Sequence, residues 1–520
     1  MPKPNQGAVA DARPGFSGQV RIILTICVIV ATLMQSLDST IANVALPYMQ
    51  GPMAASQDEI NWVLTSYIVA SAIMTAPTGF LVGRFGRTRV FVVSIVGFTV
   101  ASVLCGAAQS LGQIVIFRIL QGFFGAALVP LSQAVMYDIY PMEQRGQAMA
   151  MWGMGVQVGP VIGPIIGGWL TANYNWRWVF YINVPFGILS AIGLLLFLKE
   201  TSHSRLTKLD WIGFVALSLA IGAFQTLLDR GEELDWFGSR EIVIEACVAG
   251  LGFYVFLVQS SLVRKPFISP RLFKDMNFVI GISLMFVVGV VLYATLALMA
   301  PYLQGLMNYP VITAGVVLAP RGAGTMFAMV LAGSLIRRVN VRLLISAGFV
   351  VSAYSLYDMT LWTPNISERT IISTGFIQGV SIGLVFVPLS TIVFATLPQQ
   401  LRTEASGVYS LMRSLGSAIG ISVTGALLQS NTQINHAIIA EVVTPFNRAL
   451  QTGGASRFWN PEFTPGAATL NEQITRQANI IGYVDDFKLM LILSIMALPL
   501  VLLIRTSAHT QSADALPKKA

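Results

Sequence analysis

The chain has 520 residues, of which 54% are hydrophobic and only 11% are charged, and its mean hydropathy is +0.69. In an ordinary soluble domain about a quarter of the residues are charged. This composition excludes a soluble globule and predicts an all-α polytopic membrane protein.

Apolar runs long enough to cross a bilayer, about twenty residues each, occur throughout the chain. The first run follows the polar residues 1–20 and has no small-residue cleavage site, so we expect it to be retained as a membrane span. The fourteen predicted spans lie near 22–46, 60–82, 90–108, 112–135, 147–170, 178–198, 211–228, 241–261, 279–301, 312–336, 343–361, 370–396, 405–428 and 488–505.

Lysine and arginine mark alternate loops. They precede span 1 and follow spans 2, 6, 8 and 10, whereas the opposite short loops hold almost none. Positive side chains collect in cytoplasmic loops, so both termini are predicted to be cytoplasmic. Because the net charge of +8 is spread over successive loops, it does not indicate a nucleic-acid-binding face. The loop cations include Lys3, Arg13, Arg21, Arg84, Arg87, Arg89, Lys199, Arg205, Lys208, Arg264, Lys265, Arg271, Lys274, Arg337, Arg338 and Arg342.

The spans and loops divide the chain into successive parts. The three cysteines, Cys27, Cys105 and Cys247, fall inside apolar runs and are expected to be small buried hydrophobes, not disulfides or metal ligands. The predicted parts are a cytoplasmic tail 1–20, a six-helix half 21–200, two inserted helices 201–262, a second six-helix half 263–510 that includes a long polar loop 429–487 on the far side, and a cytoplasmic tail 511–520.

Asp38 lies well inside the first span. On a helix Gln35, Ser39 and Asn43 share with it an arc of about 140°, which predicts a polar face that lines a wet cavity. An ionised acid inside a bilayer costs several kcal/mol unless it is paired or hydrated, so Asp38 is a candidate functional acid. The alternative is an acid that caps or staples helices 1 and 4.

Span 4 carries Arg118 at a depth comparable to that of Asp38. A lone arginine in lipid is expensive, so Arg118 should face the cavity and find an acid or free carbonyl groups. Earlier in the chain, Tyr67 in span 2 is the candidate cavity residue, and Gly86 in the following loop suits a tight reversal.

The fifth span contains GVQVGPVIGPIIGG, residues 155–168. Glycine recurs at every fourth position, so the glycines drift only about 40° per step and form one flat helix face. That face predicts backbone contact with a second helix, and the prolines loosen the helix where they remove hydrogen bonds. A static packing motif is the alternative. The residues concerned are Gly155, Gly159, Pro160, Gly163, Pro164, Gly167 and Gly168.

The chain repeats itself at a shift of about 257 residues. Gln121-Gly122 recurs as Gln378-Gly379, and the sequence VPLS at 129–132 recurs at 387–390. Spans 1–6 therefore match spans 9–14, with spans 7 and 8 inserted between two like halves. Two like halves around a midplane cavity are a transporter plan. Because the counterpart of Arg118 is Gly375, the ionisable side chains are concentrated in the first half.

Three ionisable side chains inside the later spans are also candidates to line the cavity: Arg321, Asp358 and Arg413. The whole predicted substrate cavity comprises Gln35, Asn43, Tyr67, Gln121, Gln157, Arg321, Asp358 and Arg413.

Four stretches resemble motifs of the 14-span drug:proton antiporters of the EmrB/QacA type in the major facilitator superfamily: LDSTIANVALP (37–47), GFLVGRFGRTR (79–89), FRILQGFFGAALVP (117–130) and GPVIGPIIGG (159–168). The resemblance covers essentially the whole chain. It implies the major facilitator fold with two six-helix halves plus two inserted helices.

The resemblance also implies roles for individual residues. Asp38 and Arg118 would couple protons, and the glycine stretch at 155–168 would accompany exchange. The loop after span 2 would form a cytoplasmic gate, although Gly83 replaces an acid that is usual there. The implied gate residues are Gly79, Arg84, Gly86 and Arg87.

The implied function is proton-driven export of lipophilic or amphipathic compounds across a bacterial inner membrane. The sequence has no P-loop, so the proton gradient, not a cofactor, is the expected energy source. A long loop at 429–487 resembles the Gram-negative EmrB branch and implies a periplasmic adaptor and an outer-membrane channel. The alternatives are a dedicated exporter of fatty acids or siderophores and a membrane receptor without transport. An intramembrane enzyme would need a nucleophile–base pair or a metal-binding cluster, and the sequence shows neither.

Overall fold

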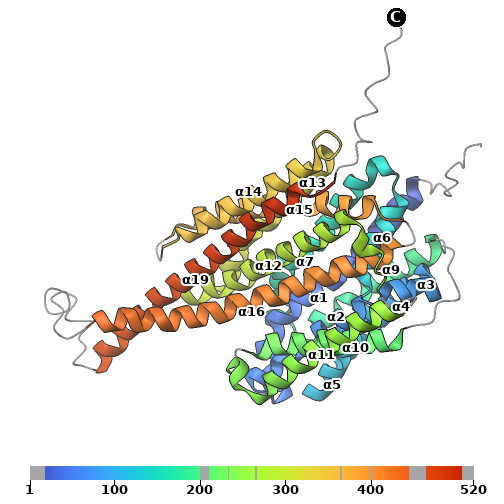
Figure 1. Cartoon of the computed structure of the whole chain (residues 1–520). Coiled ribbons are helices and arrows are strands. Elements are labelled where there is room, and N and C mark those ends of the chain that lie inside the picture. Colours follow the sequence, from blue (N-terminus) through green and yellow to red (C-terminus); the bar gives the residue numbers. More distant parts are fainter. Residues whose placement is uncertain are drawn as a thin grey trace, which may run out of the picture.

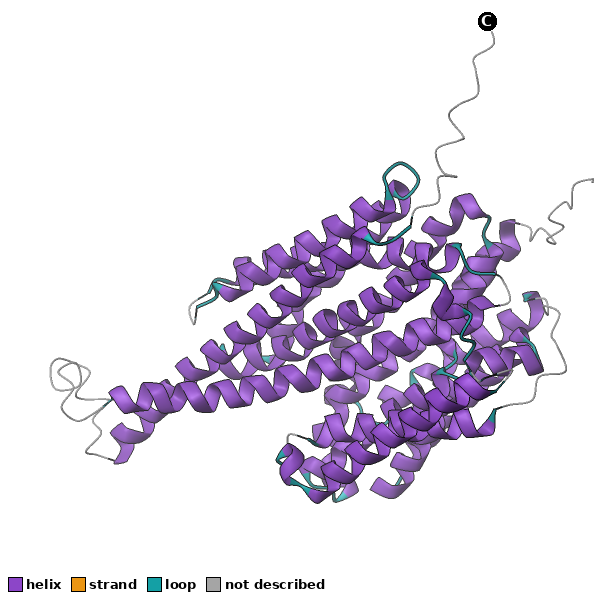
Figure 2. Ribbon diagram, in the orientation of Figure 1, coloured by secondary structure: helices purple, strands orange, loops and turns teal. Residues whose placement is uncertain are grey.

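The computed structural model describes residues 18–198, 210–231, 234–263, 266, 268–363, 366–398, 401–443 and 464–505. All regular structure in these segments is helical (Figure 2). Most of the predicted N-terminal tail, the predicted C-terminal tail and the basic loop after span 6 lie outside the described residues. The all-α membrane fold predicted from composition is confirmed.

The first half consists of α1 (Gly18–Met53), α2 (Gln57–Thr75), α3 (Thr78–Phe85), α4 (Arg87–Ala107), α5 (Leu111–Gly125), α6 (Leu128–Ile139), α7 (Arg145–Asn173), α8 (Trp178–Tyr181) and α9 (Asn183–Phe197). The inserted pair is α10 (Trp211–Arg230) and α11 (Arg240–Leu262). The second half consists of α12 (Met276–Pro301), η4 (Tyr302–Leu306), α13 (Val311–Leu335), α14 (Val341–Thr360), α15 (Glu368–Ala395), α16 (Arg402–Val442) and α19 (Thr464–Leu502).

The two halves are built from equivalent helix contacts (Figure 1). In the first half α1 packs against α7, α2 against α5, and α4 against α5 and α9. In the second half α12 packs against α16, α13 against α15, and α14 against α15 and α19. The inserted helices α10 and α11 pack on each other, and α10 touches both α2 and α16. This arrangement is the one that the internal repeat predicts.

All fourteen predicted spans fall on helices, but the count of fourteen is confirmed only in part. By length and apolar composition, 12 helices in the described part of the chain can cross a membrane, or 13 if the bent pair α2 and α3 counts as one span. That pair bends by 56° next to Pro77. The remaining helix, α19, carries Asp485, Asp486 and Lys488 at the start of its apolar stretch.

The segment 429–487 was predicted as a long loop, but its described parts, 429–443 and 464–487, are helical except for Val443; residues 444–463 lie outside the described residues. Helix α16 continues to Val442 and α19 begins at Thr464, so both helices extend well past the rest of the bundle (Figure 1). The 41 residues of α16 span about 60 Å at 1.5 Å per residue, twice the hydrocarbon thickness.

Polar contacts join the two extensions, which together form the projecting hairpin (429–442 and 464–487). Thr432 donates to Asn479 at 2.9 Å, and the His436 and Asn471 side chains are 2.9 Å apart. The polar composition of this segment therefore reflects helices exposed to water, and composition alone does not distinguish such helices from a loop.

The glycine face of α7 lies against α1, as its spacing predicts. A Cβ atom placed on Gly159 would lie 2.6 Å from the carbonyl carbon of Ser36, and one on Gly163 would lie 2.3 Å from the Thr40 hydroxyl oxygen. The hydroxyl of Ser36 donates to the Val156 carbonyl at 2.6 Å. The two helices therefore meet at backbone distance, and the helix contact predicted from the sequence is confirmed.

We predict that Gly159→Ala destabilises the protein. The added methyl would overlap the α1 backbone, at a cost of about 1–3 kcal/mol for overpacking. That cost exceeds the gain of about 1 kcal/mol in helix propensity. The melting temperature of the purified protein in detergent should fall.

Gly250 on α11 provides the matched control, because no atom lies within 4 Å of a Cβ placed there. Gly250→Ala should keep or raise the melting temperature. An equal change in both variants would contradict a special role for the contact between α1 and α7.

Candidate functional site

The structure brings Asp38 and Arg118 together. Nη1 of Arg118 donates to Oδ2 of Asp38 at 2.6 Å, and both side chains are 0% exposed. Nε of Arg118 donates to the Val63 carbonyl at 2.9 Å. Pairing lowers the free-energy cost of burying two charges inside a membrane. Asp38 and Arg118 therefore each provide the counter-charge that the other needs.

Further polar side chains complete the cluster around Asp38. Nε2 of Gln121 donates to Oδ1 of Asp38 at 2.8 Å, and Nδ2 of Asn183 donates to the same oxygen at 3.1 Å. Both amides also contact the Ser102 hydroxyl, at 2.6 and 3.0 Å. Asp38 acts only as an acceptor in all three of its bonds, as a carboxylate does.

Two aromatic rings cover the guanidinium of Arg118. Its Cζ lies 4.3 Å from the centroid of the Tyr67 ring and 5.6 Å from that of Phe180. Rings at this distance attract a cation through their electron-rich faces. These side chains unite α1, α2, α4, α5, α8 and α9 around one buried charge pair. They are here called the Asp38 cluster (Asp38, Tyr67, Ser102, Arg118, Gln121, Phe180 and Asn183).

The polar face predicted on the first span is divided by the fold. Asp38 points into the first half, whereas Asn43 is exposed and Gln35 is half-buried. Tyr67 and Gln121, predicted as cavity residues, belong to the Asp38 cluster and are buried. The stapling role considered for Asp38 is therefore part of the geometry, and cavity lining stays a prediction.

The other predicted cavity residues lie apart from the Asp38 cluster. Gln157 on α7, Asp358 on α14 and Arg413 on α16 are half-buried. The Thr374 hydroxyl donates to the Asp358 carboxylate. Arg321 on α13 is 5% exposed and donates to the Leu292 carbonyl at 3.1 Å.

A buried acid that sequence reasoning missed is Asp486 on α19. It is 0% exposed, and neither carboxyl oxygen has a hydrogen-bond partner in the described part of the chain. Tyr483 and Phe487 beside it belong to an apolar cluster. The residue was overlooked because the predicted span began two positions later, at 488; a run of apolar residues on both sides of it was the available signal.

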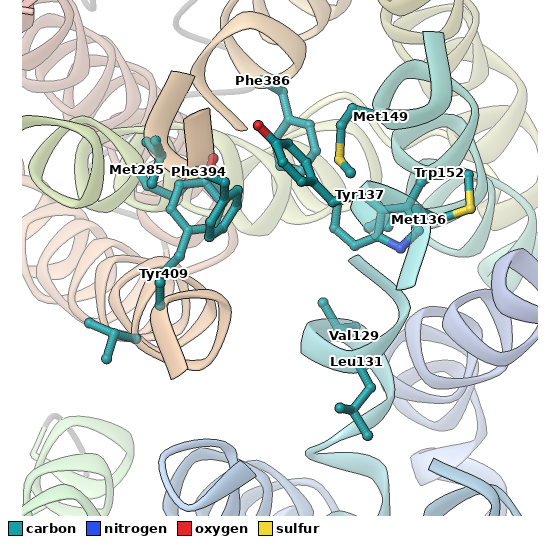
Figure 3. Close-up of a cluster of buried hydrophobic side chains, with 14 of the residues drawn as sticks. Val129, Leu131, Met136, Tyr137, Met149, Trp152, Met285, Phe386, Phe394 and Tyr409 are labelled. Carbon is teal, nitrogen blue, oxygen red and sulfur yellow. The ribbon is translucent and has the colours of Figure 1, made fainter. Parts of the chain in front are cut away.

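The two halves touch through an aromatic seam (Tyr137, Trp152, Phe386, Phe394 and Tyr409), which Figure 3 shows from α6, α7, α15 and α16. The Trp152 and Phe386 rings stack at 5.9 Å, and the Tyr137 and Phe394 rings meet edge to face at 6.0 Å. The seam lies at the ends of these helices near Arg87, Arg145 and Arg402, here called the arginine-rich end.

The predicted gate residues lie at the same end. Gly86 has φ of 91° and ends α3, which confirms the tight reversal. A Cβ on Gly79 would lie 2.8 Å from Cα of Glu404, so glycine there lets α3 reach α16 of the other half.

Asp138 is a second acid that sequence reasoning missed. Arg87 of the loop binds its Oδ2 at 2.8 Å, and Arg402 of the second half approaches its Oδ1 at 3.5 Å. Asp138 thus supplies an acid beside a loop that has Gly83 where an acid is usual. Its place at the end of α6, facing an arginine-rich loop, was the available signal.

Comparisons with known proteins agree with this architecture. A model of the Major Facilitator Superfamily matches residues 28–421. The chain is 36% identical over 501 residues to the fatty acid resistance protein FarB of Neisseria gonorrhoeae, covering 96% of this chain and 98% of FarB. It is 34% identical over 477 residues to the multidrug export protein EmrB of Escherichia coli K12, covering 91% of this chain and 93% of EmrB.

Among solved structures, the chain resembles the proton:xylose symporter XylE with a TM-score of 0.58. The match covers 91% of this chain and 97% of XylE at 14% sequence identity. This likeness concerns the fold.

We predict opposite effects of removing the two buried acids. Asp38→Asn leaves the Arg118 guanidinium buried without its counter-charge, and breaking such a pair costs about 3–5 kcal/mol. Asp486→Asn removes no hydrogen bond among the described residues and should leave stability equal or higher. Melting temperatures in detergent at neutral pH compare the two. A larger fall for Asp486→Asn would mean that Asp486 has a partner.

Proposed function

The chain belongs to the major facilitator superfamily and is a multi-pass membrane transporter, not an enzyme, and on that premise we propose that it exports lipophilic or amphipathic compounds in exchange for protons. The observation that carries the proposal is the Asp38 cluster, a buried charge pair in which both carboxylate oxygens of Asp38 accept hydrogen bonds inside a membrane span. FarB is named as a fatty acid resistance protein and EmrB as a multidrug export protein, and both names support an exporter.

The Asp38 cluster supplies a means of coupling. Protonation of Asp38 would remove the negative charge that Arg118, Gln121 and Asn183 hold in place. Arg118 would then favour a different position, and helices from the whole first half would adjust with it. If substrate and proton favour different states of the transporter, exchange of one for the other follows.

The seam and the glycine contact describe how such states would differ. The two halves meet at the arginine-rich end, which the positive-inside rule assigns to the cytoplasm. Rocking one half against the other would open that end and close the opposite one. The backbone contact at Gly159 would couple α1, which carries Asp38, to α7, which carries Trp152 of the seam.

The proposed location is a bacterial inner membrane with both termini cytoplasmic, and the proposed energy source is the proton gradient. Neither needs a bound cofactor.

The projecting hairpin is the proposed docking site for a periplasmic adaptor that leads to an outer-membrane channel. Ile434, Ile438 and Val442 recur there at every fourth residue and are 54%, 56% and 69% exposed. An apolar stripe on helices beyond the bilayer suits a helical partner.

A dedicated exporter of fatty acids is the second candidate function, favoured by the name of FarB. A siderophore exporter and a receptor without transport are the remaining alternatives from the sequence. Efflux from a deletion strain, measured over dyes, antibiotics, bile salts and fatty acids, separates these cases. Broad export supports a multidrug transporter, export of one class supports a dedicated one, and binding without flux supports a receptor.

We predict that Asp38→Asn abolishes proton-driven export. The amide mimics the protonated acid, so substrate binding should persist while an imposed pH gradient no longer drives transport. The measurement is substrate flux in proteoliposomes with and without the gradient. Transport at the wild-type rate with unchanged pH dependence would move the proton site to the second half.

The topology gives an independent prediction. Reporter fusions after residues 205 and 270 should be cytoplasmic, and fusions near 235 and 455 should lie on the far side. If 235 and 270 lie on the same side, α10 and α11 do not both cross the membrane.

A further inference from the structure

The second half contains a buried arginine that has no acid. Arg321 is 5% exposed, and its Nη2 donates to the Leu292 carbonyl at 3.1 Å. Its Nη1 is buried and has no hydrogen-bond partner among the described residues. No described carboxylate lies within 4.0 Å of the guanidinium, whereas Arg118 in the first half has Asp38 at 2.6 Å.

The internal repeat shows which residue of the first half corresponds to Arg321. A Cβ on Gly122 would lie 2.4 Å from the Tyr67 carbonyl oxygen, and a Cβ on the equivalent Gly379 would lie 1.9 Å from the Arg321 carbonyl oxygen. Arg321 therefore takes the place in the second half that Tyr67 takes in the first. Tyr67 lies against Arg118 of the charge pair in the first half. Arg321 therefore lies at the position in the second half that corresponds to the neighbourhood of that pair.

The acid of that pair is missing in the second half. In the first half Gln121 donates to Asp38 at 2.8 Å. The equivalent Gln378 donates instead to the Thr295 hydroxyl, at 3.3 Å. A hydroxyl is neutral, so the second half keeps the amide and a cation without a counter-charge.

There is also room beside Arg321. Gly375 is the counterpart of Arg118, and a Cβ placed on it would meet only Cβ of Arg321 within 4 Å, at 3.8 Å. The long side chain that fills this position in the first half is thus absent. Close packing of α13 on α15 at Gly379 holds the Arg321 backbone, and the bond to the Leu292 carbonyl positions the guanidinium.

A guanidinium in this state favours an anion as its partner. Arg321 lies ten residues from the start of α13 at Val311, about 15 Å along this membrane-spanning helix. Leaving its charge unmatched at this depth is costly. A carboxylate matches the planar, forked donors of arginine, and an apolar body attached to it would be tolerated among membrane helices.

We propose that Arg321, with the space beside Gly375, binds the carboxylate headgroup of an amphipathic substrate, such as a fatty acid or a bile acid. This inference rests on the proposed export function and specifies its substrate class. It assigns the two halves separate tasks, since the first half holds its arginine with its own acid and the second half leaves its arginine for the substrate.

The test uses two carboxylates, each compared with its uncharged methyl ester: cholate with methyl cholate, and dodecanoate with methyl dodecanoate. Binding of each radiolabelled probe to the purified full-length protein is measured at pH 7.5, where both acids are ionised. Wild-type protein should bind at least one of the two carboxylates about tenfold more tightly than its ester, as a charge-assisted hydrogen bond provides. A preference for cholate alone or dodecanoate alone identifies which source the site takes.

Variants on both sides of the site make the test specific. Arg321→Gln should bring the ratio of carboxylate to ester affinity close to one, and Arg321→Lys should keep part of it. Gly375→Asp should place an acid beside Arg321 and lower carboxylate affinity about tenfold, whereas Gly375→Asn provides the uncharged control. Arg230→Gln, which removes a half-buried arginine paired with Glu241, should keep the wild-type ratio.

The proposal is overturned if wild-type protein does not prefer either carboxylate, or if Arg321→Gln keeps the preference. It is also overturned if Gly375→Asp and Gly375→Asn weaken carboxylate binding equally, because that result would reflect space and not charge. Carboxylate preference without proton-driven flux in proteoliposomes would reject the proposed export function and leave the binding site standing.

Discussion

A charge buried in the bilayer is costly unless it is paired, and in the first half Asp38 and Arg118 pair with each other. The amides of Gln121 and Asn183 and the ring of Tyr67 then surround the pair, so one ionic contact organises six helices. The same contact makes the first half sensitive to protonation. Loss of one charge leaves the other without compensation in a medium that solvates neither.

The second half has equivalent helix contacts, but it lacks a buried charge pair like that of Asp38 and Arg118. Thr295 stands where the first half has Asp38, and Arg321 stands where it has Tyr67. Backbone packing depends on glycine at Gly122 and Gly379, and this packing has been kept in both halves while the side chains around it diverged. A transporter needs both a site for the coupling ion and a site for the substrate, and divergence of two like halves provides room for each.

Some features of the site followed from the sequence, and others did not. The depth of Asp38 and of Arg118 along their helices could be counted, so their meeting was a reasonable expectation. Asn183 was not among the predicted site residues, and Asp486 lies outside the predicted span 488–505. Asp138 was missed because the gate was sought within the loop at 79–89, and its acid comes from another helix. In each case the side chains that surround the residue come from neighbouring helices.

The sequence by itself determined the membrane class, the helical spans, the repeat of two halves and the glycine face of α7. These are local properties, since apolar length decides insertion and four-residue spacing decides which side chains share a helix face. Only the tertiary structure decided that α16 and α19 continue as the projecting hairpin, that Asp38 is fully enclosed by neighbouring helices, and that Arg321 has no acid beside it among the described residues. Whether a polar side chain is paired depends on atoms brought near it by packing, and packing joins residues that are far apart in the chain.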